Sequence, residues 1–126
     1  MIFEIESHKT LAEIDANLKD AAARHKFGVL SVIDLKQKMQ DKGVDFASSC
    51  SVYEICNPHQ AKRALEANWA VSTALPCRIS VFGSEGNYKI ATMLPSQMMK
   101  AFGAPGLDAV AEEVEQSVIA IVKESA

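Results

Sequence analysis

The fold is decided by residues 77–93, Cys77-Arg78-Ile79-Ser80-Val81-Phe82-Gly83-Ser84-Glu85-Gly86-Asn87-Tyr88-Lys89-Ile90-Ala91-Thr92-Met93. Residues 77–82 and 88–93 each suit a strand, and the loop Gly83–Asn87 between them contains two glycines. Glycine supplies the unusual dihedral angles that a tight reversal needs. We therefore expect a β-hairpin, and strands joined in this way are antiparallel neighbours.

Three further strands are predicted upstream of this hairpin. Residues 1–6 indicate a short strand that opens the sheet, and residues 27–33 are rich in β-branched side chains, as in a mostly buried strand. Residues 45–56 alternate in the manner of a strand, but neither face is purely apolar. Together with the hairpin, these segments predict one sheet.

Helices are predicted where capping signals and helical spacing coincide. Ser/Thr/Asp/Asn side chains at a helix start accept hydrogen bonds from backbone donors that have no partner within the helix. The predicted helices are Thr10 to about His25, Asp34 to Gly43, Pro58 to about Asn68, Pro95–Phe102, and a last one whose stripe is Leu107, Val110, Val114, Val118 and Ile121. The connection 69–76 is predicted to be packed, because it contains Trp69, Val71 and Leu75.

These elements predict an α+β fold, a two-layer sandwich in which helices pack on a mainly antiparallel sheet. The chain has 126 residues, and we expect residues 1–126 to form a single domain. The composition of 48% hydrophobic and 23% charged residues is that of an ordinary folded protein. Extended disorder is excluded on this basis.

The charge pattern excludes several classes of partner. A net charge of -3 with dispersed lysines gives no basic surface for nucleic acid. No apolar run approaches the roughly 20 residues that a membrane helix needs, and the start of the chain does not resemble a secretory signal. We expect a cytoplasmic protein that binds neither nucleic acid nor membrane.

Two of the three cysteines carry the chemistry that the sequence offers. Cys56 lies in Ile55-Cys56-Asn57-Pro58 and Cys77 in Leu75-Pro76-Cys77. A helix start beside Cys56 would favour the thiolate, whereas a nearby Glu54 carboxylate would oppose it. A buried, inert cysteine is the other interpretation of Cys56.

Two further hypotheses concern pairs of these residues. If the strand that ends at Cys56 pairs near the strand that begins at Cys77, the sulfurs meet and form a dithiol or a reversible disulfide. Cys56 and His59 also have the spacing of two metal ligands, with Cys77 or Cys50 as further thiolate ligands for zinc or copper. The favoured interpretation has neither a metal nor a cofactor.

Several short motifs resemble one known family. In chain order they are Lys26-Phe27-Gly28-Val29-Leu30, Val32-Ile33-Asp34, Gly43-Val44-Asp45-Phe46, Cys56-Asn57-Pro58-His59-Gln60-Ala61, Ala64-Leu65 and Leu75-Pro76-Cys77-Arg78-Ile79-Ser80-Val81. Taken together, they resemble the bacterial and archaeal domain of unknown function family 302 over most of the chain. The family often has a small residue before the Cys-Asn-Pro motif, where this chain has Glu54 and Ile55.

The resemblance implies a compact domain with an antiparallel sheet, commonly assembled as a homodimer, and it implies no activity. Carried across by position, Cys56, Asn57, Pro58, Pro76 and Cys77 would form a shared structural site.

We therefore interpret the chain as a small homodimeric module that binds a small-molecule ligand or a partner. Its predicted site contains Cys56, Asn57, Cys77, His59 and Glu54. The alternatives are a thiol-dependent redox enzyme, in which Cys56 attacks and Cys77 resolves, a metal-handling protein, and a purely structural interaction domain. The redox alternative requires an accessible Cys56 with a low pKa.

Overall fold

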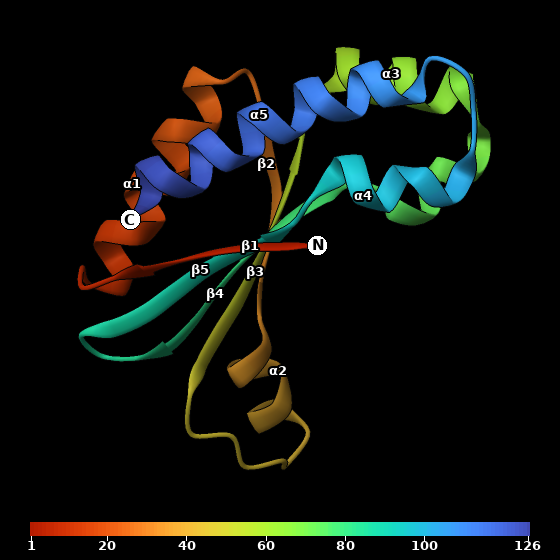
Figure 1. Cartoon of the computed structure of the whole chain (residues 1–126). Coiled ribbons are helices and arrows are strands. Elements are labelled where there is room, and N and C mark those ends of the chain that lie inside the picture. The colour runs from red at the N-terminus through yellow and green to blue at the C-terminus, as the bar shows by residue number, and fades with distance from the viewer.

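A computed structural model describes all 126 residues as an α+β fold (Figure 1). Five strands form one sheet in the order β1-β5-β4-β3-β2, in which every neighbouring pair is antiparallel. The strands are β1 (Ile2–Ser7), β2 (Gly28–Asp34), β3 (Ser49–Cys56), β4 (Cys77–Ser84) and β5 (Asn87–Met93). The helices are α1 (Leu11–Arg24), α2 (Leu35–Asp41), α3 (Pro58–Ala67), α4 (Pro95–Met99) and α5 (Leu107–Ser125), with 3-10 turns η1 (Trp69–Ala74) and η2 (Lys100–Phe102). The predicted fold class is confirmed.

The predicted hairpin is β4 and β5, paired from Ile79↔Thr92 to Ser84↔Asn87. Gly83 has φ 129°, and a Cβ at this position would collide with the carbonyl oxygen of Asn87. The sequence therefore needs glycine at the end of β4, where the two backbones come close together.

The sheet has one covered face. Helices α1 and α5 pack against each other and lie across this face, as Figure 1 shows. Their side chains meet those of the central strands in a main cluster, which we call the sheet core. It includes Ile14, Leu18, Ala21, Ala22, Phe27, Tyr53, Ile55, Ile79, Val81, Tyr88, Ile90, Val118, Ile121 and Val122. The two-layer prediction is thereby confirmed.

Strand β2 is more exposed than the sequence predicts. It lies at an edge of the sheet, where only β3 pairs with it, and its register shifts between Val29 and Ser31. Leu30, at this bulge, is 63% exposed, and Val32 is 43% exposed. The expectation of a mostly buried strand is wrong because strand order, which periodicity does not reveal, decides how much neighbours cover.

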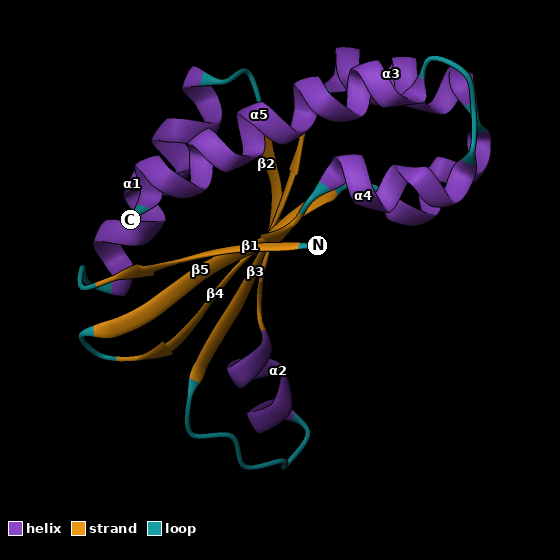
Figure 2. Ribbon diagram, viewed as in Figure 1, coloured by secondary structure: helices purple, strands orange, loops and turns teal.

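A second apolar cluster lies beyond the sheet core, where α3, α4 and the connecting turns extend from it (Figure 2). We call this part the helical arm, residues 58–74 and 95–111. The buried members of the second cluster are Ala64, Val71, Met99, Leu107, Val110 and Ala111. Trp69 is 74% exposed, so the packing of residues 69–76 rests on Val71 and Leu75 rather than on the tryptophan.

Side chains from α5 hold the arm in place. Glu115 accepts hydrogen bonds from the backbone N–H and the hydroxyl of Ser96, at 3.1 and 2.6 Å, and so caps the short helix α4. Arg63 of α3 forms an ion pair with Glu113 of α5. Helix α5 therefore runs from the arm into the sheet core and is common to both.

The predicted helix starts are confirmed in the structure. Thr10 and Glu13 form a complete capping box at α1, and Asn57 accepts from the backbone N–H groups of His59 and Gln60 at α3. Asp34 caps α2, but the side chain of Gln37 bonds to Asp41 instead of reaching back. No helix is long and apolar enough to cross a membrane.

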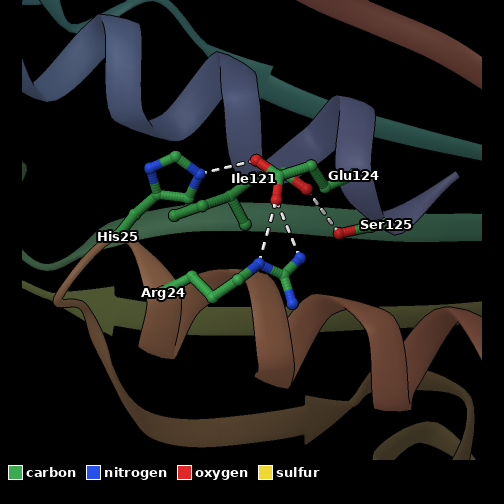
Figure 3. Close-up of polar contacts among 5 residues, drawn as sticks. All are labelled: Arg24, His25, Ile121, Glu124 and Ser125. Carbon is green, nitrogen blue, oxygen red and sulfur yellow. Dashed lines mark hydrogen bonds and ion pairs between the residues drawn. The ribbon is translucent and has the colours of Figure 1, made fainter.

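The far ends of α1 and α5 are joined by a polar clamp, shown in Figure 3. Glu124 accepts hydrogen bonds from Arg24 at 2.7 Å and pairs with His25 Nε2 at 2.6 Å. These contacts, led by the bond to His25, hold the pKa of Glu124 below its usual range. Beside the clamp, the buried hydroxyl of Ser125 donates to the carbonyl of Ile121 at 2.6 Å.

Candidate functional site

A narrow apolar cavity lies where the sheet core meets the helical arm. Twelve of its fifteen lining residues are hydrophobic. One wall comes from the sheet and the loop before β2, and the other from α3, α4 and α5. The lining residues are Phe27, Ile55, Cys56, Asn57, Gln60, Ala61, Ala64, Leu75, Cys77, Pro95, Met99, Leu107, Val110, Ala111 and Val114. The cavity is therefore built from segments distant in the chain.

Two strand ends bring the predicted thiols to this cavity. Cys56 is the last residue of β3 and Cys77 the first of β4, and Ile55 is the register partner of Cys77. Asn57 then caps α3, which carries the chain away from the sheet. Cys56, Asn57 and Cys77 lie at the same end of the sheet, because antiparallel pairing places the end of one strand beside the start of the next.

Burial makes ionisation of both thiols less favourable. Burial raises the pKa of Cys56. Burial, with a smaller contribution from the nearby Cys56, raises the pKa of Cys77 to about 11. The thiolate, which is the nucleophile in thiol chemistry, is therefore disfavoured at neutral pH. All three cysteines are free, so the predicted disulfide is not formed in this structure.

Gln60 contributes the one polar feature of the cavity that sequence reasoning missed. Its Oε1 is buried and has no hydrogen-bond partner, and no other buried side-chain N or O atom is in this condition. Gln60 is the third residue of α3, where a glutamine side chain often reaches back to the capping residue. Here Asn57 accepts from the Gln60 backbone N–H at 3.2 Å. The only sequence pattern that marks Gln60 is the Asn57-x-x-Gln60 spacing, and this pattern predicts helix capping rather than a place in a cavity.

Two predicted site residues lie outside the cavity lining. Glu54 precedes Ile55 in β3 and so points to the opposite face of the sheet, where it accepts from Ser31 at 2.6 Å and pairs with Arg78 at 3.4 Å. Glu54 makes no contribution to the raised pKa of Cys56. His59 is exposed in the first turn of α3.

No set of three or more His, Cys, Asp or Glu side chains is arranged to hold a metal ion. The predicted set of Cys56, His59 and either Cys77 or Cys50 is not assembled: His59 is outside the cavity, and Cys50 pairs with Phe82 near the far end of β3. The metal-handling hypothesis therefore lacks a ligand set in this structure.

A second hollow adjoins the cavity and is more polar. Cys77 and Pro95 line both spaces, and Thr73, Arg78 and Thr92 contribute polar groups to the second one. Thr92 donates its hydroxyl proton to the carbonyl of Arg78 at 2.8 Å. Cys77 therefore lies between an apolar space and a more polar one.

Comparisons with other proteins agree on one family. A sequence profile described as "Domain of unknown function DUF302" matches residues 3–125. A crystal structure of an uncharacterized conserved DUF302 protein from Bacillus stearothermophilus is similar at 27% identity and a TM-score of 0.92, over 99% of this chain and 98% of that chain. No curated protein gives a significant match.

Proposed function

The chain belongs to the family described as Domain of unknown function DUF302, and for this member we propose a ligand-binding module whose site is the cavity between the sheet core and the helical arm. The observation that carries the proposal is that Cys56, Asn57 and Cys77 line one apolar cavity. An apolar cavity with few polar groups is the usual form of a small-molecule site.

The chemistry of the walls favours binding over catalysis. A general acid or base would need a titratable group with a suitable pKa beside the ligand. The titratable side chains lining the cavity are the two thiols, and burial raises the pKa of both. This also disfavours the redox alternative, which requires Cys56 to ionise readily.

The walls also differ in how readily they adjust. Ile55 is itself fully buried in the sheet core, whereas Met99 and Ala111 belong to the arm. A methionine side chain has three rotatable bonds and adapts to irregular spaces. The arm side of the cavity is therefore the side that would adjust to a ligand.

Thiol alkylation tests the proposal on the intact protein. 1-Butanol serves as the ligand probe, and iodoacetamide labelling of each cysteine is followed by peptide mass spectrometry. We expect 1-butanol to slow labelling of Cys56 and Cys77 while leaving Cys50 unchanged, since Cys50 does not line the cavity. Equal rates with and without 1-butanol at Cys56 and Cys77 would reject the cavity as a binding site.

The proposal includes assembly as a homodimer, which the resemblance to the family implies. Edge strand β2 supports this, because an unpaired strand edge with apolar side chains is prone to pair with another chain. Leu30 is the most exposed of the apolar side chains on this strand. We propose that this edge contributes to the dimer interface.

Light scattering after size-exclusion chromatography tests the dimer. We expect twice the chain mass for the wild type and the single chain mass for Leu30→Lys. Trp69→Lys is the matched control, since Trp69 is also an exposed apolar side chain but lies on the arm. A monomeric wild type would contradict the proposed assembly, and a dimeric Leu30→Lys would move the interface elsewhere.

A further inference from the structure

We infer that Gln60 selects the ligand, which is a slim aliphatic molecule bearing one O–H or N–H donor, such as a primary alcohol or a primary amide. This inference rests on the proposed function, because it specifies which ligands the same cavity prefers. It starts from the exceptional state of one atom, Gln60 Oε1, which is buried without a hydrogen-bond partner.

An orphaned buried carbonyl oxygen is costly. Leaving a buried acceptor unsatisfied costs about 1–3 kcal/mol. Every other buried side-chain N or O atom in the protein has a partner; Thr92 and Ser125, for example, donate to backbone carbonyls at 2.8 and 2.6 Å. The rest of the fold thus satisfies its polar groups, and the exception lies in the lining of the cavity. In the empty cavity Oε1 is closed off from solvent, so the adaptable arm wall has to shift for a ligand donor to reach it. Its placement on a lining residue is the reason to assign it to a ligand.

No donor of the surrounding residues bonds to Gln60 Oε1. The Asn57 side chain is turned to the start of α3, where its Oδ1 accepts from two backbone N–H groups at 3.1 and 3.2 Å. The other neighbours in the lining are mainly apolar, such as Ala61, Ala64 and Val110. A donor from the ligand would therefore meet an acceptor that has no competing partner.

The size of the cavity restricts the rest of the ligand. The cavity has a volume of about 30 Å³, room for about two water molecules. A cavity that binds benzene measures about 150 Å³. A ring is therefore too wide to enter without movement of the walls. Of a slim unbranched chain, only the head group and its nearest carbon fit inside, and the rest lies toward the open side of the cavity.

The carboxylate of a fatty acid is not the expected head group. A carboxylate only accepts hydrogen bonds at neutral pH, so it would place two acceptors against each other at Oε1. Neither Lys nor Arg lines this cavity to neutralise such a charge. The preferred head group is therefore neutral and donates a hydrogen bond.

Two isomers provide the test, because 1-butanol and methyl propyl ether have the same atoms but only the alcohol carries a donor. Each is titrated into the ¹⁵N-labelled full chain, and binding is followed by backbone chemical shifts of the cavity lining. We expect the alcohol to bind about twofold to tenfold more tightly, the range of one net hydrogen bond. Gln60→Met keeps the length of the side chain but removes the acceptor, and we expect it to bind the two isomers equally.

Gln116→Met is the matched control, since Gln116 is exposed on α5 and outside the lining. It should keep the preference for the alcohol. Equal binding of both isomers to the wild type, with shifts in the lining, would overturn the role of Gln60 and leave the cavity as a binding site. If neither isomer shifts the lining residues, the proposed function itself fails.

Thermal unfolding gives a second readout that does not depend on a ligand. Gln60→Met removes an unsatisfied buried oxygen, so its Tm should equal or exceed that of the wild type. A Tm clearly below both the wild type and Gln116→Met would show that Oε1 has a partner within the protein, which would also overturn the inference.

Discussion

The sheet core and the helical arm are filled with different side chains. The sheet core consists mainly of large, fully buried aliphatic residues from long elements, such as Ile14, Ile79, Ile90 and Ile121. The arm combines two alanines and a methionine with Val71, Leu107 and Val110, and apart from α5 its elements are short, since α4 has only five residues. Close packing is the norm in protein interiors, and the cavity forms where these two kinds of packing meet.

This difference in packing indicates where the fold leaves space for a ligand. The sheet fixes the positions of Cys56 and Cys77 through strand register. The arm supplies the opposite wall, held by α5 through contacts such as the cap that Glu115 provides for α4. Val114 packs against both clusters. The site thus has one rigid wall and one adaptable wall.

Truncating one residue in the sheet core and one in the arm tests most directly whether the two regions are packed differently. Ile90→Ala in the sheet core should lower the free energy of unfolding by about 4 kcal/mol, since it leaves a cavity in a closely packed region. Met99→Ala should cost about 2 kcal/mol, at the low end of such changes, because its side chain already borders empty space.

Urea denaturation of the two variants measures both values. Ile2→Ala is the control, since Ile2 is 57% exposed on the edge strand β1 and its truncation should cost far less. An equal cost for Ile90→Ala and Met99→Ala would show that the two regions are packed alike.

The pH dependence of stability tests how deeply Cys77 is buried at the boundary between the two regions. Cys77 has a folded-state pKa of about 11, against an ordinary value of 9.0. Its contribution to stability is therefore complete below pH 9 and is lost as the pH rises toward about 11, because the unfolded chain ionises first. The loss should reach about 2–3 kcal/mol.

Denaturation of the wild type and of Cys77→Ala across this pH window isolates that loss, which the variant should lack. Cys50→Ala, as the control, should retain it. If Cys77→Ala and the wild type lose stability in parallel above pH 9, the Cys77 thiol is not buried as described.

Filling the cavity should separate ligand binding from stability. Ala111→Val adds two methyl groups to the arm wall. Their burial stabilises the fold, the lower helix propensity of valine opposes it, and the net gain should be about 1 kcal/mol. Stability should stay within about 1 kcal/mol of the wild type. Protection of Cys56 and Cys77 by 1-butanol should fall at least about fivefold, equivalent to about 1 kcal/mol of binding energy.

Alkylation rates and urea denaturation of the same sample measure both effects. Ala109→Val, at an exposed position of α5, is the control for helix propensity. Full protection in Ala111→Val would mean that 1-butanol binds elsewhere.

The clamp at Glu124 should give the smallest effect. Glu124→Gln weakens the exposed contacts to Arg24 and His25, so we expect a slight decrease in Tm above pH 4.5. Because the folded-state pKa of Glu124 is lowered, this difference should disappear as the pH falls through that pKa.

Glu112→Gln, at an exposed site without an ion pair, is the control for loss of charge. The clamp joins α1 to the end of α5, at the sheet core and away from the arm, so 1-butanol binding should be unchanged. A change in binding would show that the two regions are coupled through α5.

Local signals in the sequence predicted most elements of the fold. The hairpin at residues 83–87 depends on neighbouring glycines, and the starts of α1 and α3 depend on Thr10 and Asn57, so each could be predicted from a few adjacent residues. The exposure of β2 could not, because it depends on the strand's place in the sheet.

The candidate site could be predicted only in part. Cys56, Asn57 and Cys77 lie at strand ends, so their meeting follows from antiparallel pairing. Glu54 and His59 were included because they are near in sequence, but strand alternation and the first helical turn direct them elsewhere. The apolar walls come from distant segments, which no local pattern brings together, and Gln60 has the spacing of a capping residue.

A crystal structure of the protein soaked in 1-butanol tests the central claim most directly. We predict density for the alcohol between the sheet wall at Cys56 and Cys77 and the arm wall at Met99, with its hydroxyl within hydrogen-bond distance of Gln60 Oε1. Density elsewhere on the protein, with this cavity unchanged, would contradict the account.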